Sequence, residues 1–348
     1  MKKLSLVNKI LYFFNLLFAV AWGLAFLAPY LNPKTFSLSA VLAIAYPIII
    51  GIHVLFVAYW LIRLNIKIYV SILALSISYF FSVPIFQSKS VFKALAKDKS
   101  FSIMSFNSQL SYFSGGKKEE VKEQQSKIIH FLNQEHPDVL CLQEARKGLN
   151  DYLNYPYHTN YGYSQIYSKH KIVSTGNMSF EENSSNSSCY ADLLINEDTI
   201  RIYNLHLESL HLGIEDYKLL KNSLNESSDQ ELQSHTKHLK NKIHLAATKR
   251  VNQVDEIMES IIRSPYPSVL CGDFNDVAQS YVYKQLTSQH NDAFLTSGKG
   301  YGATYRQLLF PFRIDYILTP KNWAAFNFEV LEEKLSDHQA IRCDIELN

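Results

Sequence analysis

Residues Ser268–Asp276, SVLCGDFND, carry the clearest indication of how most of this chain folds. The apolar run Val269–Cys271 is typical of a buried strand, and Gly272 leads from it into two polar side chains one residue apart. Because residues i and i+2 of a strand share a face, Asp273 and Asn275 can point to the same place. The stretch therefore predicts a sheet that delivers a carboxylate and an amide to one polar site, although the same residue types also form ordinary turns.

Other apolar runs in the chain also end in polar side chains. Asn107 ends the run SIMSF, and Glu144 comes directly after the run VLCLQ. A carboxylate that follows a buried strand is costly unless it meets a cation or water. Taken singly, each of these residues is equally compatible with a turn or a satisfied core group. Eight such residues lie at or near the ends of strand-like runs: Asn107, Glu144, His206, Asp273, Asn275, Asp315, Asp337 and His338.

Two segments between these strands are predicted to be helices. Residues 119–134 place their apolar side chains on one face, and a longer helix runs from His235 to Ile262. The spacing of His235 and His238 is compatible with zinc, but no third ligand follows at a useful distance, which favours a solvated helix face. The polar segment 208–234 is interpreted as a surface insertion, with a lid or a membrane-touching flap as alternatives.

The first 87 residues have the composition of a membrane anchor. Three runs are almost wholly apolar: Ile10–Tyr30, Phe36–Ile62 and Ile68–Phe86. Each approaches or exceeds the roughly 20 residues that cross a bilayer as a helix, so we expect three transmembrane helices. A cleaved signal peptide would explain only the first run. The expected organisation is an anchor over residues 1–87, a polar linker over 88–100 and a large domain over 101–348.

Basic residues indicate how this anchor is oriented. Three lysines precede the first run, and Arg63 and Lys67 separate the second from the third, which favours a cytoplasmic position for both loops. Three crossings would then place the large domain on the opposite side, which is the periplasm for a protein of the bacterial inner membrane. Four lysines between residues 89 and 99 argue for the other orientation, but long domains translocate largely regardless of such charges.

Charge is distributed unevenly along the chain. The formal charge of +2 combines 34 basic with 32 acidic residues, but six of the basic residues and none of the acidic ones lie before residue 88. The remainder has 28 basic and 32 acidic residues, a net charge of −4, which gives no electrostatic case for gripping a nucleic-acid backbone. The four widely spaced cysteines form no CxxC motif and are expected to be buried free thiols.

Taken together, the strand ends resemble the endonuclease/exonuclease/phosphatase superfamily, which has the fold of deoxyribonuclease I. The matching words are SIMSFN, LQE, NLHL, GDFN, RIDYIL and SDH, in the family's order, and they cover the chain from Phe101 to the C-terminus. No single one of these short motifs is specific for the superfamily, but their joint occurrence in this order is. The resemblance implies an α+β fold, a four-layer α/β/β/α sandwich with its site at one edge, preceded here by the three expected transmembrane helices.

The same resemblance implies a metal site for the hydrolysis of a phosphate ester. By this likeness Glu144 holds a Mg²⁺ or Mn²⁺ ion, with Asn107 and Asp337 nearby. The hard oxygen ligands of these side chains suit such an ion better than they suit zinc.

Catalytic roles follow from the resemblance in the same way. Asp273 would orient or deprotonate the attacking water, and Asn275 would bind a phosphate oxygen. His338, steered by Asp315, and His206 would stabilise the charged phosphoryl group or assist proton transfer. The implied chemistry is in-line hydrolysis, in which the metal offsets charge on the transferring group.

The words shared by the family do not separate nucleases, phosphatases and lipid phosphodiesterases. An anchor would raise the effective concentration of an enzyme at lipid headgroups, and the acidic domain disfavours nucleic acid. The expected substrate is therefore a lipid headgroup or a small phosphoester, with Arg250 and Tyr305 as its candidate contacts. A deoxyribonuclease-like endonuclease is the second interpretation, and a catalytically silent membrane scaffold is the third.

Overall fold

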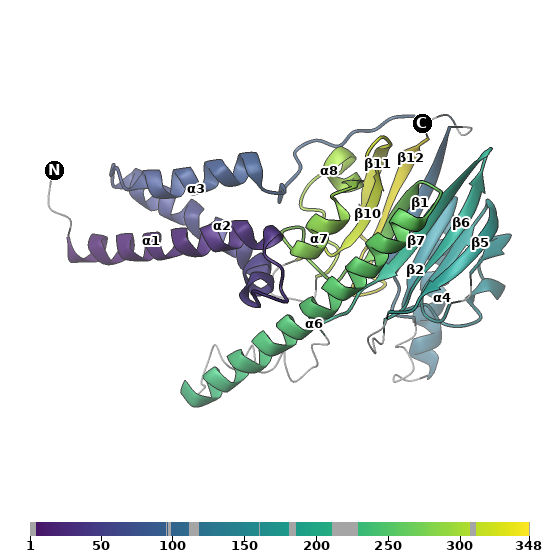
Figure 1. The fold of residues 1–348 in the computed structure, drawn as a ribbon, viewed down its shortest axis with the longest axis horizontal. Helices are drawn as coiled ribbons and strands as arrows, with labels where there is room; N and C mark the ends of the chain where they lie inside the picture. The colour runs from purple at the N-terminus through teal and green to yellow at the C-terminus, as the bar shows by residue number, and fades with distance from the viewer. Residues whose placement is uncertain are drawn as a thin grey trace. The chain divides into compact units, whose positions relative to one another are not determined.

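Two mixed sheets, each of six strands in the described part of the chain, form the larger of two compact units, residues 86–209, 252–276 and 285–348 (Figure 1). The computed structural model describes residues 5–94, 96, 99–110, 118–159, 161–180, 186–210, 229–306 and 311–347. The first sheet is ordered β11 (Ala324–Leu331), β12 (Ala340–Glu346), β1 (Ser100–Asn107), β2 (Val139–Gln143), β4 (Gln165–Ser168) and β3 (Tyr157–His158). The second is ordered β5 (Lys171–Met178), β6 (Ser188–Ile195), β7 (Asp198–His206), β8 (Ser268–Asp273), β10 (Asp315–Pro320) and β9 (His290–Asp292).

The facing sides of the two sheets enclose one apolar core. Every residue of β2 and β8 is buried, as expected for central strands that are covered on both faces. All four cysteines are free, buried and part of this core. The prediction of buried free thiols is confirmed, and they act there as small apolar side chains.

Helices cover the outer faces of both sheets. α4 (Lys118–Glu135) packs Ile128, Phe131 and Leu132 against the first sheet. Residues 252–263 of α6 (Asp229–Arg263) lie on the second sheet, where the Ser260 and Tyr203 hydroxyl oxygens are 2.8 Å apart. The predicted four-layer sandwich is confirmed, and so are its two long helices. The shorter helices are η2 (Leu149–Asp151), α7 (Tyr281–Leu286) and α8 (Ala293–Ser297).

Strand register brings polar residues to one edge of the sandwich. In the second sheet, Asp273 of β8 is the Cα partner of both His206 in β7 and Asp315 in β10. In the first sheet, Asn107 of β1 lies opposite Gln143 of β2, which directly precedes Glu144. Because β1 and β2 are parallel, and β7 and β8 are parallel, the carboxyl ends of each pair meet at the same edge.

The smaller unit, residues 1–85, 210–251 and 277–284, contains the apolar N-terminal helices. By length and composition, α1 (Leu6–Leu27), extended by η1 (Ala28–Tyr30), and α2 (Leu38–Ile62) could each cross a membrane. The third run forms α3 (Ile68–Phe81), whose 14 residues span only about 21 Å. The prediction of three spanning helices is therefore wrong for the third, because Pro84 cannot continue a helix and disfavours helical backbone at the residue before it.

Polar contacts fix the directions of these three helices. Two side-chain hydrogen bonds of 2.8 Å join α1 to α3, from Asn15 to Ser71 and from Trp22 to Ser78. Since both partners advance by seven residues, α3 runs in the same direction as α1. α2 runs the opposite way, because Tyr59 near its end donates to Asn8 of α1 at 2.6 Å. Consequently, the end of α3 lies beside the connection between α1 and α2, where the Tyr46 and Ser82 hydroxyls are 2.6 Å apart.

The predicted insertion at residues 208–234 is described only in part, since residues 211–228 lie outside the described residues. At its start, Leu210 joins an apolar cluster within the smaller unit. That cluster combines Leu239, Ile243 and Ala247 of α6 with Ala40, Val41 and Ile44 of α2. The amphipathic first half of α6 therefore packs against one of the two candidate membrane helices.

We expect Gly272→Ala to destabilise the protein strongly. Gly272 has a φ of +137°, and an added Cβ would lie 1.9 Å from the Leu205 carbonyl oxygen, which is fixed in β7. Gly148→Ala is the control, because its φ of +76° strains alanine by about 1–2 kcal/mol but no atom lies within 4 Å of the new Cβ. Thermal unfolding of the full chain in detergent measures both effects, and equal shifts in Tm would contradict the expectation.

Candidate active site

Asp273 is the centre of a buried polar cluster at this edge. Its side chain is 1% exposed, and Oδ2 accepts a hydrogen bond of 3.1 Å from Asn107 Nδ2. The same oxygen lies 3.7 Å from His206 Nε2 and 3.6 Å from His338 Nε2. Burial raises the pKa of Asp273, whereas the two imidazoles lower it. Three strands from both sheets, together with the connection between β11 and β12 that carries His338, thus supply one cluster of interacting side chains.

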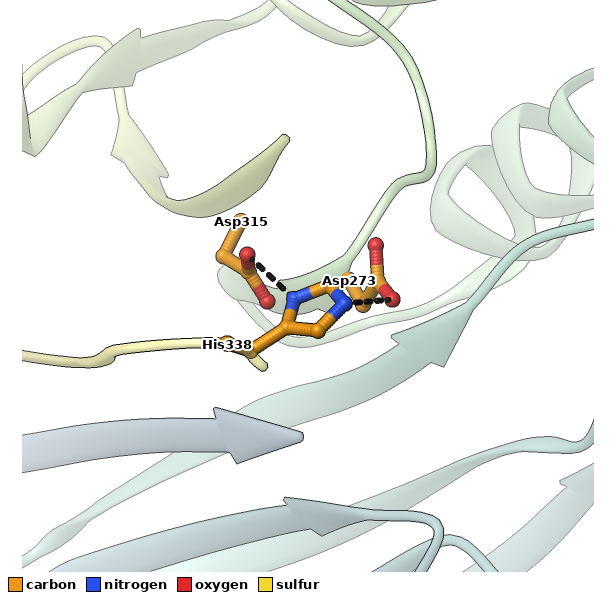
Figure 2. Close-up of side chains that lie close together, drawn as sticks. All are labelled: Asp273, Asp315 and His338. Carbon is orange, nitrogen blue, oxygen red and sulfur yellow. Dashed lines mark hydrogen bonds and ion pairs between the residues drawn. The ribbon is translucent and has the colours of Figure 1, made fainter. Parts of the chain in front are cut away.

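His338 lies between two carboxylates (Figure 2). Its Nδ1 is 2.9 Å from Asp315 Oδ2, while its Nε2 faces Asp273. Burial lowers the pKa of His338, but the charges of Asp315 and Asp273 outweigh that effect and raise the pKa to about 10. The imidazole is therefore protonated at neutral pH and brings a positive charge into the site.

Glu144 follows β2 in the left-handed backbone region, with a φ of 51°. This conformation is uncommon outside glycine and is often found at functional positions. Its Oε1 accepts from Asn107 Nδ2 at 3.1 Å and lies 3.7 Å from His206 Nε2. Burial raises the pKa of Glu144 to about 7, with further contributions from the charges of Asp273 and Asp337. The described residues around Glu144 therefore stabilise the charged form of its carboxylate poorly.

One oxygen of Glu144 fits a divalent cation. Oε2 is buried, and none of the described residues makes a hydrogen bond to it. A cation at this oxygen would stabilise the charged form of Glu144 and satisfy the unpaired acceptor. Asp337, which accepts from Ser336 Oγ at 3.2 Å, is close enough for its charge to affect Glu144. Carboxylate oxygens of this kind suit Mg²⁺ or Mn²⁺.

A second group of possible metal ligands consists of Asp273, Asp315 and His338. One ligand atom from each lies within 4.8 Å of the others. However, a protonated imidazole has no lone pair to offer a metal, and both nitrogens of His338 already face carboxylates. The side of the cluster formed by Glu144 and Asp337 is therefore the better place for a cation.

The two predicted asparagines contact the carboxylates. Asn107 Nδ2 bridges Glu144 and Asp273, so its amide nitrogen rather than its oxygen faces them. Asn275, with a φ of 52°, donates its backbone N–H to Asp273 Oδ1 at 2.9 Å and its Nδ2 to the Leu207 carbonyl at 2.9 Å. Because an amide nitrogen carries two hydrogens, Asn275 retains the donor that a phosphate oxygen would need.

The two predicted substrate contacts have different environments. Tyr305 is half-buried, and its ring centroid lies 4.9 Å from that of His338. Arg250 lies on α6 with only 1% of its surface exposed, which leaves little of it for a substrate to contact in this conformation. The roles of both residues in substrate binding stay predictions.

Several supporting residues were not found from the sequence. Ser188 Oγ accepts from the His206 backbone N–H at 2.9 Å, and Thr304 Oγ1 accepts from the Asp315 backbone N–H at 3.2 Å. Gln143 and Asn204 join the two sheets behind the cluster. The presence of these two amides inside otherwise apolar strands was a usable signal, because buried amides must find partners. In addition, β10 begins at Asp315, which therefore lies at a strand end, as the sequence predicted.

A sandwich of two mixed sheets with carboxylates and imidazoles at one edge defines a class of α+β hydrolases. The sequence model of the Endonuclease/Exonuclease/phosphatase family matches residues 104–338, and the chain belongs to this family. Its members hydrolyse phosphoester bonds, so the resemblance drawn from the strand ends is confirmed. A second family model, described as a domain of unknown function, matches residues 8–84. No curated protein matches the chain.

Solved structures share the fold of the larger unit at low sequence identity. A functionally unknown conserved protein from Enterococcus faecalis has a TM-score of 0.51 and 15% identity, with 71% of this chain and 100% of that chain covered. Humanized TDP2 of D. rerio has a TM-score of 0.50 and 18% identity, with 71% and 99% covered. A family member from Bacteroides vulgatus has a TM-score of 0.50 and 16% identity, with 72% and 99% covered. These similarities show the fold alone.

We expect Glu144→Gln to preserve the fold and to weaken Mn²⁺ binding by at least about tenfold, or about 1.4 kcal/mol, because it removes the charge of the unpaired oxygen. Isothermal titration of the full chain in detergent measures the affinity. Glu135→Gln is the matched control, since its carboxylate pairs with Arg342 at 3.0 Å. Equal Mn²⁺ affinities for the wild type and Glu144→Gln would exclude Glu144 as a ligand.

Proposed function

We propose that this protein is a membrane-anchored, divalent-metal-dependent phosphoesterase that acts on a lipid headgroup or a small phosphoester. The observation that carries the proposal is the meeting of Glu144, Asp273 and His338 at one edge of the sandwich, with Asp315 2.9 Å from the other nitrogen of His338. An unpaired carboxylate oxygen on one side and an imidazolium on the other provide separate positions for a cation and for an anionic phosphoryl group.

Each residue of the cluster has its own role in the proposed in-line hydrolysis. Asp273 orients the attacking water and accepts its proton. His338, kept protonated by Asp315, stabilises negative charge on the phosphoryl oxygens. His206, 3.7 Å from Asp273, assists the proton transfer, and Asn275 donates to a phosphate oxygen. Each of these groups is placed by a strand end, so little reorganisation is needed when the substrate binds.

The cation site of this proposal consists of Glu144 and Asp337, with Asn107 beside it, where its Nδ2 joins Glu144 to Asp273. When bound there, Mg²⁺ or Mn²⁺ would supply Lewis-acid stabilisation of the charge that develops on the transferring group. Glu144 contributes its unpaired Oε2, and Ser336 holds the carboxylate of Asp337 in place.

Chain connectivity supports a substrate that is held at the membrane. Leu210 follows His206 by four residues and belongs to the apolar cluster on α2. Gln279 follows Asn275 by four residues, and its Nε2 lies 3.4 Å from the Phe26 carbonyl oxygen at the end of α1. Two catalytic loops therefore continue directly into segments that pack on the anchor helices. The net charge of −4 after residue 87 disfavours nucleic acid as the alternative substrate.

The proposed orientation places the larger unit in the periplasm. The chain leaves the helices beside the connection between α1 and α2, whereas Lys67 lies at the other end, over the Tyr12 ring. The positive-inside rule assigns that basic end, which also holds Lys9 and Arg63, to the cytoplasm.

We expect the full chain in nanodiscs to hydrolyse phospholipid or bis-p-nitrophenyl phosphate with Mg²⁺ and to lose this activity with chelator. Asp273→Asn and His338→Ala should each lower kcat by about 10²- to 10⁴-fold, because each removes a group that acts on the reacting atoms. Asp198→Asn, at the exposed start of β7, is the control. Cleavage of plasmid DNA in preference to the other substrates would favour an endonuclease, and no hydrolysis at all would favour a silent scaffold.

Orientation can be measured with single exposed cysteines in a bacterial inner membrane. We expect a membrane-impermeant maleimide to label Lys34→Cys and Lys299→Cys in intact spheroplasts, because both residues are exposed and are assigned to the periplasmic side. Arg63→Cys should be labelled only after the membrane is opened. Labelling of Arg63→Cys but not of Lys299→Cys in intact spheroplasts would reverse the orientation.

A further inference from the structure

We infer that Gln143 and Asn204 form an inter-sheet latch whose task is to set the distance between the cation position and the catalytic residues. This inference rests on the proposed function, since it assigns two positioning residues to the same site. The side-chain hydrogen bonds of Gln143 and Asn204 among the described residues go to other residues than those of the cluster around Asp273. Their effect on the site is exerted through the strands that they hold together.

The latch joins one sheet to the other by directional contacts. Gln143 is at the end of β2 in the first sheet, Asn204 is in β7 of the second, and both are 0% exposed. Gln143 Nε2 donates to Asn204 Oδ1 at 2.6 Å. Asn204 Nδ2 donates in the opposite direction to the carbonyls of Leu142 and Gln165, at 2.8 Å and 3.0 Å. Those two carbonyls belong to paired residues of β2 and β4, so Asn204 grips two strands of the first sheet.

The core around the latch is largely apolar, although Gln143 Nε2 also donates to Ser105 Oγ of β1 at 3.1 Å. Residues two positions before each amide, Cys141 and Ile202, are fully buried in the inter-sheet core, and so is Cys189, the strand partner of Asn204. Apolar contacts are non-directional, so they favour packing of the sheets but only weakly oppose sliding of one sheet over the other. A hydrogen bond between amides is directional, and losing one partner leaves a costly unpaired group. The latch therefore specifies one relative position of the two sheets.

That position matters because the site is itself divided between the sheets. Glu144 directly follows Gln143, and His206 lies two residues after Asn204 on the same face of β7. The distance of 3.7 Å between Glu144 Oε1 and His206 Nε2 spans the two sheets, as does the hydrogen bond from Asn107 to Asp273. A displacement of about 1 Å at such a site can lower a reaction rate by about 10²-fold, even though each sheet keeps its own strand pairing.

Three variants test the latch: Gln143→Met, Asn204→Leu and the double variant, each in the full chain in detergent. The measurements are Tm without metal, Mn²⁺ affinity, and kcat with bis-p-nitrophenyl phosphate. Each single variant should lower Tm, because Gln143→Met takes the donor from Asn204 Oδ1 and Asn204→Leu takes the acceptor from Gln143 Nε2, which keeps only Ser105 Oγ at 3.1 Å. The double variant should recover part of that loss, because neither end of the hydrogen bond between the two amides is then left unpaired. Mn²⁺ affinity and kcat of the double variant should nevertheless stay about 10- to 100-fold below those of the wild type.

A double variant at the opposite end of the second sheet is the matched control. Arg201 of β7 and Asp192 of β6 form a partly buried ion pair of 2.7 Å, remote from the strand ends that carry the site. Arg201→Met combined with Asp192→Leu should change Tm while Mn²⁺ affinity and kcat keep their wild-type values.

The two kinds of readout separate the outcomes. If kcat and Mn²⁺ affinity recover together with Tm in the double variant, the pair is only structural and the latch is overturned. Normal kcat and Mn²⁺ affinity in both single variants would overturn it as well. The wild type could also hydrolyse none of the substrates. If the double variant then regains Tm but still binds Mn²⁺ more weakly than the wild type, the proposed function fails and the latch stands.

Discussion

The site depends on one balance of buried charge, that between Asp273, His338 and Asp315. A buried carboxylate is costly by itself, and the protonated imidazole of His338 offsets that cost. His338 in turn stays protonated because Asp315 lies 2.9 Å from its other nitrogen. Glu144 lies beside this group, and its buried Oε2 accepts no hydrogen bond from the described residues.

Local patterns in the sequence predicted the elements of the fold better than their arrangement. The period of two placed Asp273 and Asn275 at one strand end, and apolar periodicity placed the helices at 119–134 and 235–262 near their observed bounds. Neither pattern reports which strands become neighbours. β4 and β5 illustrate this limit, because only two residues separate Ser168 from Lys171 and yet the strands belong to different sheets. Only the joint resemblance to a family supplied the convergence of residues from Asn107 to His338.

The length of α3 and the orientation of the Asn107 amide were not predicted from the sequence, and both have local physical causes. Apolar composition extends to Phe86, but Pro84 makes α3 end at Phe81, so composition alone overestimated its helical length. The resemblance predicted Asn107 near a metal, and the sequence did not show that its amide nitrogen also bridges two carboxylates. A sequence gives the residue type but not which end of an amide faces a site, because the surrounding donors and acceptors decide that orientation.

A site built on two separate sheets poses a problem that apolar packing does not solve by itself. Asn107, Glu144 and His338 belong to strands or connections of the first sheet, and His206, Asp273 and Asp315 belong to the second. Interactions within each sheet hold three of these residues firmly but leave their distance from the other three undetermined. Polar contacts across the core remove that freedom, and they do so directly behind the residues whose spacing the chemistry requires. Burying these amide groups is unfavourable in free energy, but their hydrogen bonds give the two sheets one defined relative position.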